Sequence, residues 1–115
     1  MLPSPYRLRH SDDIVRVRQG GKRWPHPLLV LFIDAQPQGL SSVSRFAFAA
    51  GRHVGKATVR NRAKRRLREI VHQHLGKIEP GHDCLFVARQ PILLADYVEL
   101  EHAMLQLLTR AGLLR

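Results

Sequence analysis

The stretch GKATVRNRAKRRLREIV, residues 55–71, combines a helical repeat of apolar residues with an unusual density of positive charge. Its apolar residues recur at spacings of three and four, which predicts an amphipathic helix that begins at a Thr58 N-cap and ends near His74. The stripe is narrow, so one face of the helix packs on a core and the other faces remain for charged side chains. The inward stripe consists of Val59, Ala63, Leu67, Ile70 and Val71.

Six of the nine residues from position 60 to 68 are basic, namely Arg60, Arg62, Lys64, Arg65, Arg66 and Arg68. Like charges four residues apart repel on a helix, and cations near its N-terminus oppose the helix dipole. A solvated helix face is the simpler interpretation of a charge run, but Glu69 is the only acidic residue between Val43 and Ile78. A phosphate-rich partner would turn the repulsion into attraction, and the excess of Arg over Lys favours forked hydrogen bonds to phosphate.

The whole chain shares this asymmetry of charge. Its 115 residues carry a net charge of +10, with 15 Lys or Arg against three acidic residues in positions 1–68 and four against six in positions 69–115. A hydrophobic content of 44% is that of a globular protein, so we expect one RNA-binding domain over residues 1–115 rather than disorder. Such a localised excess of charge is typical of a nucleic-acid-binding face.

Several classes of site and compartment are excluded. A lone Cys84 allows neither an internal disulfide nor a cysteine-based zinc site, and it suggests a reducing compartment. No segment approaches the roughly 18 apolar residues of a membrane span, and the first residues lack the apolar run of a signal peptide. We therefore expect a cytoplasmic protein with no membrane partner. Because the acidic residues are scattered and His72, His74 and His82 form no ligand set, we predict no metal site and no catalytic residue.

The rest of the chain alternates strand and helix patterns. Together the elements predict an α+β fold in which helices pack on a mostly antiparallel sheet. The predicted elements are a helix capped by Ser11 and ended by Gly20 and Gly21, strands at 28–33, 44–50 and 84–88, a loop at 36–42, and a helix at 96–111.

The ordered run from Gly55 to Glu69, with Arg60-Asn61-Arg62 at its centre, resembles the signature of the bacterial ribonuclease P protein subunit. The likeness extends to Arg7–Arg9 before the first helix, to the strand from Arg45 and to the strand from Asp83. It implies a two-layer α/β sandwich with the order α-β-β-β-α-β-α. The basic helix would then lie in a left-handed crossover between parallel strands, an exception to the usual handedness.

The resemblance also implies two sets of site residues. In the family the basic helix contacts the catalytic RNA, and a cleft between the first helix and the sheet takes the 5′ leader of precursor tRNA. The leader-cleft candidates are Ile14, Arg18, Phe32 and Phe48, where Ile14 and Arg18 replace aromatic residues that are frequent in the family. The implied RNA-binding set is Arg52, His53, Lys56, Arg60, Asn61, Arg62, Lys64, Arg65 and Arg68, with Arg52 and His53 where the family usually has two lysines.

The function implied is that of the auxiliary protein subunit of an endoribonuclease. Its partners would be ribonuclease P RNA, with one protein per RNA, and precursor tRNA, while the RNA subunit catalyses hydrolysis with Mg²⁺. Three alternatives remain from the residues alone: a ribosomal type of RNA-binding module, a DNA-binding regulator and an independent metal-dependent nuclease. The DNA-binding alternative lacks the partner helix that a helix-turn-helix motif requires.

Overall fold

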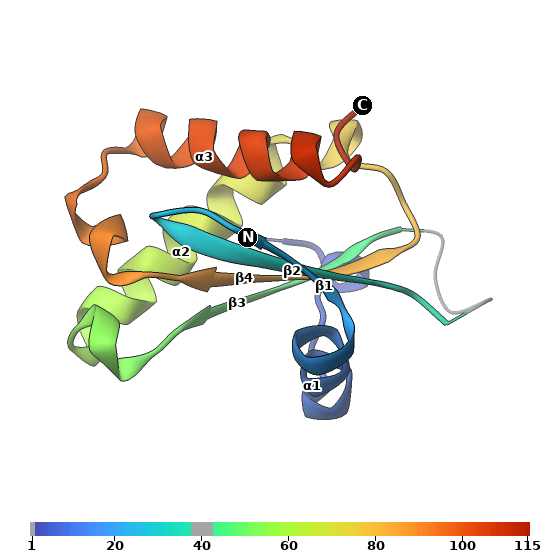
Figure 1. The fold of residues 1–115 in the computed structure, drawn as a ribbon, viewed down its shortest axis with the longest axis horizontal. Coiled ribbons are helices and arrows are strands. Elements are labelled where there is room, and N and C mark those ends of the chain that lie inside the picture. The colour runs from blue at the N-terminus through green and yellow to red at the C-terminus, as the bar shows by residue number, and fades with distance from the viewer. Residues whose placement is uncertain (1, 38–42) are drawn as a thin grey trace.

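The computed structural model describes residues 2–37 and 43–115, so positions 38–42 of the predicted loop lie outside the described residues. The described chain contains three helices and a four-stranded sheet, in the predicted order (Figure 1). The elements are α1 (Ser11–Gly20), β1 (Lys22–Pro25), β2 (Leu29–Ala35), β3 (Arg45–Ala50), α2 (Ala57–Gln73), β4 (His82–Ala88) and α3 (Tyr97–Arg110). Short 3-10 turns occupy Ser4–Tyr6, Arg52–Val54, Leu75–Lys77 and Gln90–Leu94.

The sheet is mostly antiparallel, as its strands predict. Its order is β1-β2-β4-β3, with β1 and β4 antiparallel to β2, and with β3 parallel to β4. Because β3 and β4 are parallel and adjacent, α2 is the crossover between them, which the family resemblance implies. The α+β class is confirmed, and the left hand of the crossover stays a prediction.

Helices cover both faces of the sheet (Figure 1). On one face α2 and α3 pack over a core that includes Leu31 of β2, Phe86 of β4 and Leu67 of α2, each fully buried. On the opposite face α1 packs over a smaller core formed by Leu8, Val17, Ala47 and Leu85. We call this second surface the α1 face. Because α1 has only ten residues, Phe32, Ala49 and Val87 on the α1 face remain partly exposed.

The helix starts differ from two sequence predictions. Ser11 and Thr58 are not N-caps, because His10 and Lys56 occupy those positions and neither makes a capping hydrogen bond through its side chain. In α3 the cap is complete: Asp96 accepts a hydrogen bond from the Glu99 amide at 2.8 Å, and Glu99 accepts one from the Asp96 amide at 3.3 Å. Serine and threonine within a first helical turn resemble caps in sequence, so the pattern placed these starts one to two residues late.

Candidate nucleic-acid interface

The inner stripe of α2 is confirmed by the structure. Ala63, Leu67, Ile70 and Val71 are buried and Val59 is half-buried, so the predicted apolar face is the one that packs on the sheet. The charged residues are thereby forced onto the flanks and the outer face. We call the nine residues of the implied RNA-binding set the α2 surface, and all of them are exposed or half-buried. They are Arg52, His53, Lys56, Arg60, Asn61, Arg62, Lys64, Arg65 and Arg68.

Arg66 differs from its basic neighbours, because its side chain is used within the fold. Its Nη2 donates a hydrogen bond to the carbonyl oxygen of Ala95 at 2.8 Å, which ties α2 to the segment that precedes α3. Arg68 lies on the other flank of the helix, with its guanidinium carbon 5.8 Å from the ring centroid of Phe48 on β3. The basic run therefore contains one cation committed to packing among others that face outward.

The connector before α2 is anchored by a single apolar side chain. Val54 is 1% exposed, while Arg52, His53 and Lys56 around it are exposed. Gly55 has a φ of +150°, a conformation that side chains disfavour, and it redirects the chain from the connector into α2. No side chain caps α2, so its first backbone amides have no side-chain acceptor. The cations of the connector lie at this same end of the helix, and both features favour binding of an anion there.

Three of the four leader-cleft candidates meet on the α1 face. Phe32 of β2 is half-buried, and the guanidinium carbon of Arg18 lies 5.9 Å from its ring centroid. Arg23 of β1 is the register partner of Phe32, so its side chain projects from the same face. Ile14 packs against the small core beneath α1. The ring of Phe32 thus has arginines on two neighbouring elements, of which sequence reasoning identified only Arg18.

Phe48, the fourth candidate, lies on the opposite side of the sheet. Its ring stacks on that of Phe86, with centroids 5.9 Å apart and planes 9° apart, within the core under α2. Successive strand residues point to opposite faces, so Ala47 and Ala49 face α1 while Phe48 faces α2. The prediction that grouped Phe48 with Ile14, Arg18 and Phe32 is therefore corrected.

A buried carboxylate attaches α1 to the sheet. Asp83 of β4 is 0% exposed, and Arg45 of β3 donates to both of its oxygens, at 2.9 and 2.7 Å. Arg16 of α1 also donates to Asp83 and reaches the Asp34 carboxylate at 2.7 Å. Hydrogen bonds to Asp83 raise the pKa of Arg45, so its guanidinium group stays charged. This network was not among the sequence predictions, because its members lie far apart in the chain.

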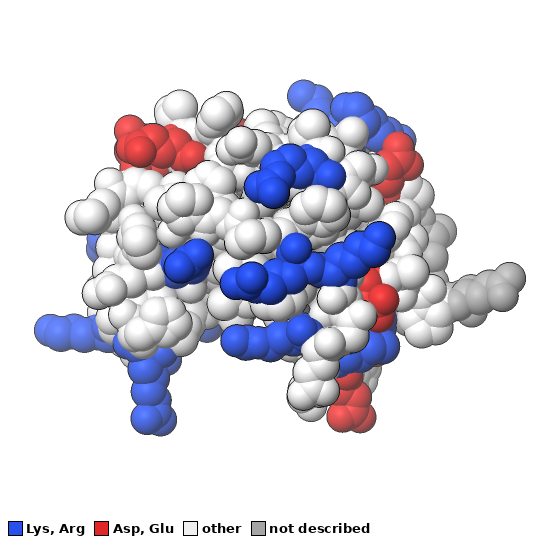
Figure 2. Space-filling view, viewed as in Figure 1, with Lys and Arg blue, Asp and Glu red and all other residues white. Residues whose placement is uncertain are grey.

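Positive charge also gathers away from α2. Figure 2 shows Lys and Arg side chains across the middle of one face of the molecule, where β1 and β2 lie between α3 and α1 in Figure 1. Lys22 and Arg23 of β1 are exposed, and the Arg110 guanidinium carbon of α3 lies 6.0 Å from the Trp24 ring centroid. Lys22 and Arg23 belong to the N-terminal excess of charge and Arg110 does not, and none of the three was predicted to be part of a site.

Among the described residues there is no cluster of metal ligands, and the cysteine is buried. Nowhere in positions 2–37 and 43–115 do three or more His, Cys, Asp or Glu side chains come together in a way that could hold a metal ion. Cys84 is fully buried, and burial raises the pKa of its thiol far above the usual range, which leaves it unreactive. None of the described helices is long and apolar enough to cross a membrane. The groups that the described residues leave exposed for a partner are cations and rings.

Comparisons with known proteins agree over nearly the whole chain. A family model described as Ribonuclease P matches residues 2–112. The chain is 38% identical over 111 residues to the ribonuclease P protein component of Roseiflexus castenholzii, covering 96% of this chain and 88% of that protein. The RNase P protein from Thermotoga maritima is 30% identical with a TM-score of 0.80, covering 90% of this chain and 96% of that one. The Staphylococcus aureus RNase P protein shares the fold, with a TM-score of 0.85 at 22% identity and coverage of 96% and 98%.

Proposed function

The chain belongs to the bacterial ribonuclease P protein family, and from this premise we propose that it binds two RNAs through two different surfaces. The family partners with ribonuclease P RNA, and together they remove the 5′ leader of precursor tRNA. The chain is thus part of an endoribonuclease whose catalysis is RNA-based. The ribosomal, DNA-binding and independent-nuclease alternatives give way to this assignment.

The α2 surface is proposed to bind the catalytic RNA. In the described structure its arginines and lysines have no carboxylate within ion-pair distance, so their charge is left for phosphate. Arg60, Lys64 and Arg68 follow one flank of the helix at four-residue intervals, and Asn61, Arg62 and Arg65 extend the row outward. A rigid helix that presents several cations in a row suits a structured RNA whose phosphates are fixed in space.

The α1 face is proposed to bind the single-stranded leader. Bases stack on aromatic rings for about 1 to 3 kcal/mol per base, and Phe32 offers such a ring with Arg18 and Arg23 beside it for phosphate. Ile14 and Val87 supply apolar surface next to the ring. Stacking of this kind tolerates any base, as an RNA-processing enzyme with many precursor substrates requires.

Magnesium is proposed to act through the RNA subunit and the substrate. The aspartates nearest the α1 face, Asp13, Asp34 and Asp83, are held by Arg16 and Arg45, so they do not fit a metal site. The protein instead would lower the Mg²⁺ requirement by supplying positive charge where RNA phosphates converge. We also propose that the chain acts as one RNA-binding domain, one copy per RNA, in the cytoplasm where precursor tRNA is made.

The observation that carries this proposal is the row of unpaired cations on α2, combined with family membership. The direct test is cleavage of precursor tRNA by the partner RNA at limiting Mg²⁺, with and without the protein. We expect the protein to increase the rate at low Mg²⁺ and to have little effect when Mg²⁺ is abundant. Equal rates with and without protein at every Mg²⁺ concentration would reject the proposed role.

A further inference from the structure

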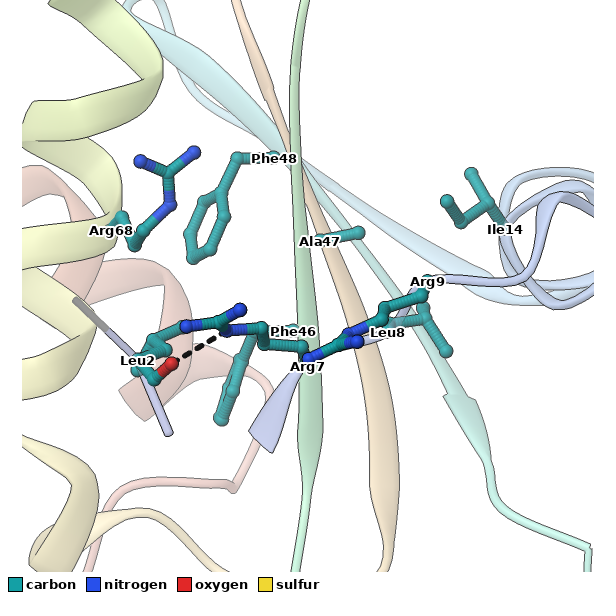
Figure 3. A pocket seen from close by; sticks show the side chains of 9 residues that line it. All are labelled: Leu2, Arg7, Leu8, Arg9, Ile14, Phe46, Ala47, Phe48 and Arg68. Atoms are coloured by element: carbon teal, nitrogen blue, oxygen red, sulfur yellow. Dashed lines mark hydrogen bonds between the residues drawn. The ribbon is translucent and has the colours of Figure 1, made fainter. Parts of the chain in front are cut away.

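A cavity of about 410 Å³ lies beside β3, between the N-terminal segment and α2. Figure 3 shows three arginines around it: Arg7 and Arg9 from the segment before α1, and Arg68 from α2. Apolar side chains of the segment and of β3, among them Leu8 and Phe48, complete the wall. Neither Arg7 nor Arg9 belongs to the residues that the family resemblance assigned to RNA.

The cavity connects the two proposed RNA surfaces. Because β3 is an edge strand, its side chains on both faces border the same opening. Phe48 points toward Arg68 and α2, whereas Ala47 points toward Ile14 and α1 (Figure 3). A single-stranded RNA leader that begins beside the catalytic RNA near α2 and continues along the α1 face would pass over the β3 edge.

The three arginines are positioned by neutral groups, so their charges are not neutralised by an ion pair. Arg7 Nε donates to the Leu2 carbonyl oxygen at 2.6 Å, and Arg9 Nη2 donates to Ser4 Oγ at 2.9 Å. Arg68 is positioned by the Phe48 ring at 5.8 Å. None of the three has a carboxylate partner among the described residues, in contrast to Arg16 and Arg45, which Asp83 neutralises. Side chains held in place with free charge are pre-organised for an anion.

We propose that Arg7, Arg9 and Arg68 form a phosphodiester-binding subsite for the leader segment that crosses the β3 edge. This inference rests on the proposed function, and it adds the route of the strand between the two surfaces. The guanidinium groups take phosphate oxygens, and Leu8 and Phe48 offer apolar surface to a sugar or base. A cavity of this volume is within the range of small-molecule sites and admits one nucleotide unit.

The order of contacts along the leader follows from the geometry. Because α2 is the proposed contact with the catalytic RNA, nucleotides close to the cleavage site meet the subsite first. Nucleotides farther toward the 5′ end then reach Phe32 on the α1 face. Loss of the subsite should therefore weaken the binding of precursors that have short leaders. Loss of the Phe32 ring should weaken only the binding of precursors with longer leaders.

The test uses the reconstituted holoenzyme and a double variant, Arg7→Gln with Arg9→Gln. Affinity is measured for mature tRNA and for precursors whose leaders lengthen one nucleotide at a time. We expect precursors to bind about tenfold more weakly, the size of one lost charge-assisted contact. Mature tRNA and the catalytic RNA should bind within about twofold of the wild type. In Phe32→Ala the loss should begin only at longer leaders.

Arg110→Gln is the control for a single lost arginine charge, matched to Arg9→Gln, because it lies at the opposite edge of the sheet beside Trp24. It should leave leader affinity unchanged. If the double variant folds poorly, as judged by circular dichroism, Arg9→Gln alone serves, since Arg9 is exposed and the Leu8–Phe46 backbone bond does not involve its side chain.

Two results would overturn the subsite. One is an unchanged leader affinity in the double variant, and the other is a loss of catalytic-RNA binding as large as the loss for precursors. Failure of the underlying function has a different signature, because the wild-type holoenzyme itself would then bind precursor and mature tRNA equally. If the wild type and the double variant both bind precursor more tightly than mature tRNA, to the same extent, the subsite is rejected and the proposed function stands.

Discussion

Asp83 and Arg68 show how the immediate neighbours of a charged side chain decide its use in this protein. Asp83 is fully buried and forms ion pairs with two guanidinium groups, and these pairs hold α1, β3 and β4 together. Arg68 lies over a ring without a carboxylate, so its charge faces outward. The chain thus contains arginines paired with a carboxylate and arginines without one, and composition alone cannot tell them apart.

The Asp83 network gives a stability prediction. Asp83→Asn keeps the side-chain volume but leaves Arg16 and Arg45 without their shared charge, so we expect a loss of about 3 kcal/mol in the free energy of unfolding. Asp34→Asn is the matched control, because Asp34 pairs with Arg16 but is 33% exposed, and its loss should stay below about 1 kcal/mol. Urea unfolding measures both values. Equal losses in the two variants would contradict the buried network.

His26 gives a pH prediction. Burial, and then the charges of Arg110 and His102, lower its pKa below the ordinary value of about 6.5. As the pH falls, His26 is therefore protonated in the unfolded chain before it is protonated in the folded protein. Its effect on the free energy of unfolding is fully favourable above about pH 6.5, and it is lost as the pH drops through the pKa of the folded state. The neutral ring also accepts a hydrogen bond from the Leu28 amide at Nδ1, at 3.0 Å.

We expect His26→Asn, whose side chain also accepts hydrogen bonds, to lose less stability than the wild type between pH 7.5 and pH 5.5. Unfolding by urea at both pH values measures the difference. Identical pH dependence in the two proteins would show that His26 does not contribute.

At the scale of elements, the attachment of α1 to the sheet depends on a close backbone approach at Gly21. A Cβ at this position would lie 2.5 Å from the carbonyl oxygens of Val17 and Ile33, which are backbone atoms that cannot move aside easily. Gly20, one residue earlier, has nothing within 4 Å of such a Cβ. Adjacent glycines in sequence therefore differ completely in their steric role.

This contrast predicts opposite effects for one substitution. Gly21→Ala should destabilise the protein by about 1 to 3 kcal/mol and displace α1, since overpacking forces backbone shifts. Gly20→Ala should be neutral or stabilise by up to about 1 kcal/mol, because it lies in an open helical position. Thermal unfolding reports the sign of each effect. A neutral Gly21→Ala would mean that α1 is not held closely against β2.

Periodic elements could be predicted from the sequence, and tertiary ones could not. The stripe of α2 was readable because Leu67 and Ile70 recur at helical spacing. The family resemblance implied a third strand before α2, but the residue pattern did not locate β1, because its four residues carry two cations and pair only with β2. The side of the sheet that Phe48 occupies depends on strand register, which family resemblance did not supply. The Asp83 network joins residues up to 67 positions apart, so no local pattern reveals it.

At the scale of the whole molecule, the sheet separates the two surfaces that we propose bind RNA. α2 and α3 cover one face and carry the α2 surface, while the other face is covered only in part by α1. Phe32 with its arginines remains accessible on that second face. Under the proposed function, this separation would let a small protein bind the catalytic RNA on one side of the sheet and the leader on the other.

The most direct test of this account measures two affinities in two variants, for catalytic RNA and for the leader of precursor tRNA. Replacing Arg60, Lys64 and Arg65 with Gln should weaken catalytic-RNA binding and lower its salt slope by about 0.7 to 0.9 per lost phosphate contact. Once that variant is saturated with RNA, its preference for precursor over mature tRNA should persist. Replacing Phe32 with Ala should abolish much of that preference and leave catalytic-RNA binding and its salt slope unchanged. Losses of both affinities in both variants would contradict the two-surface account.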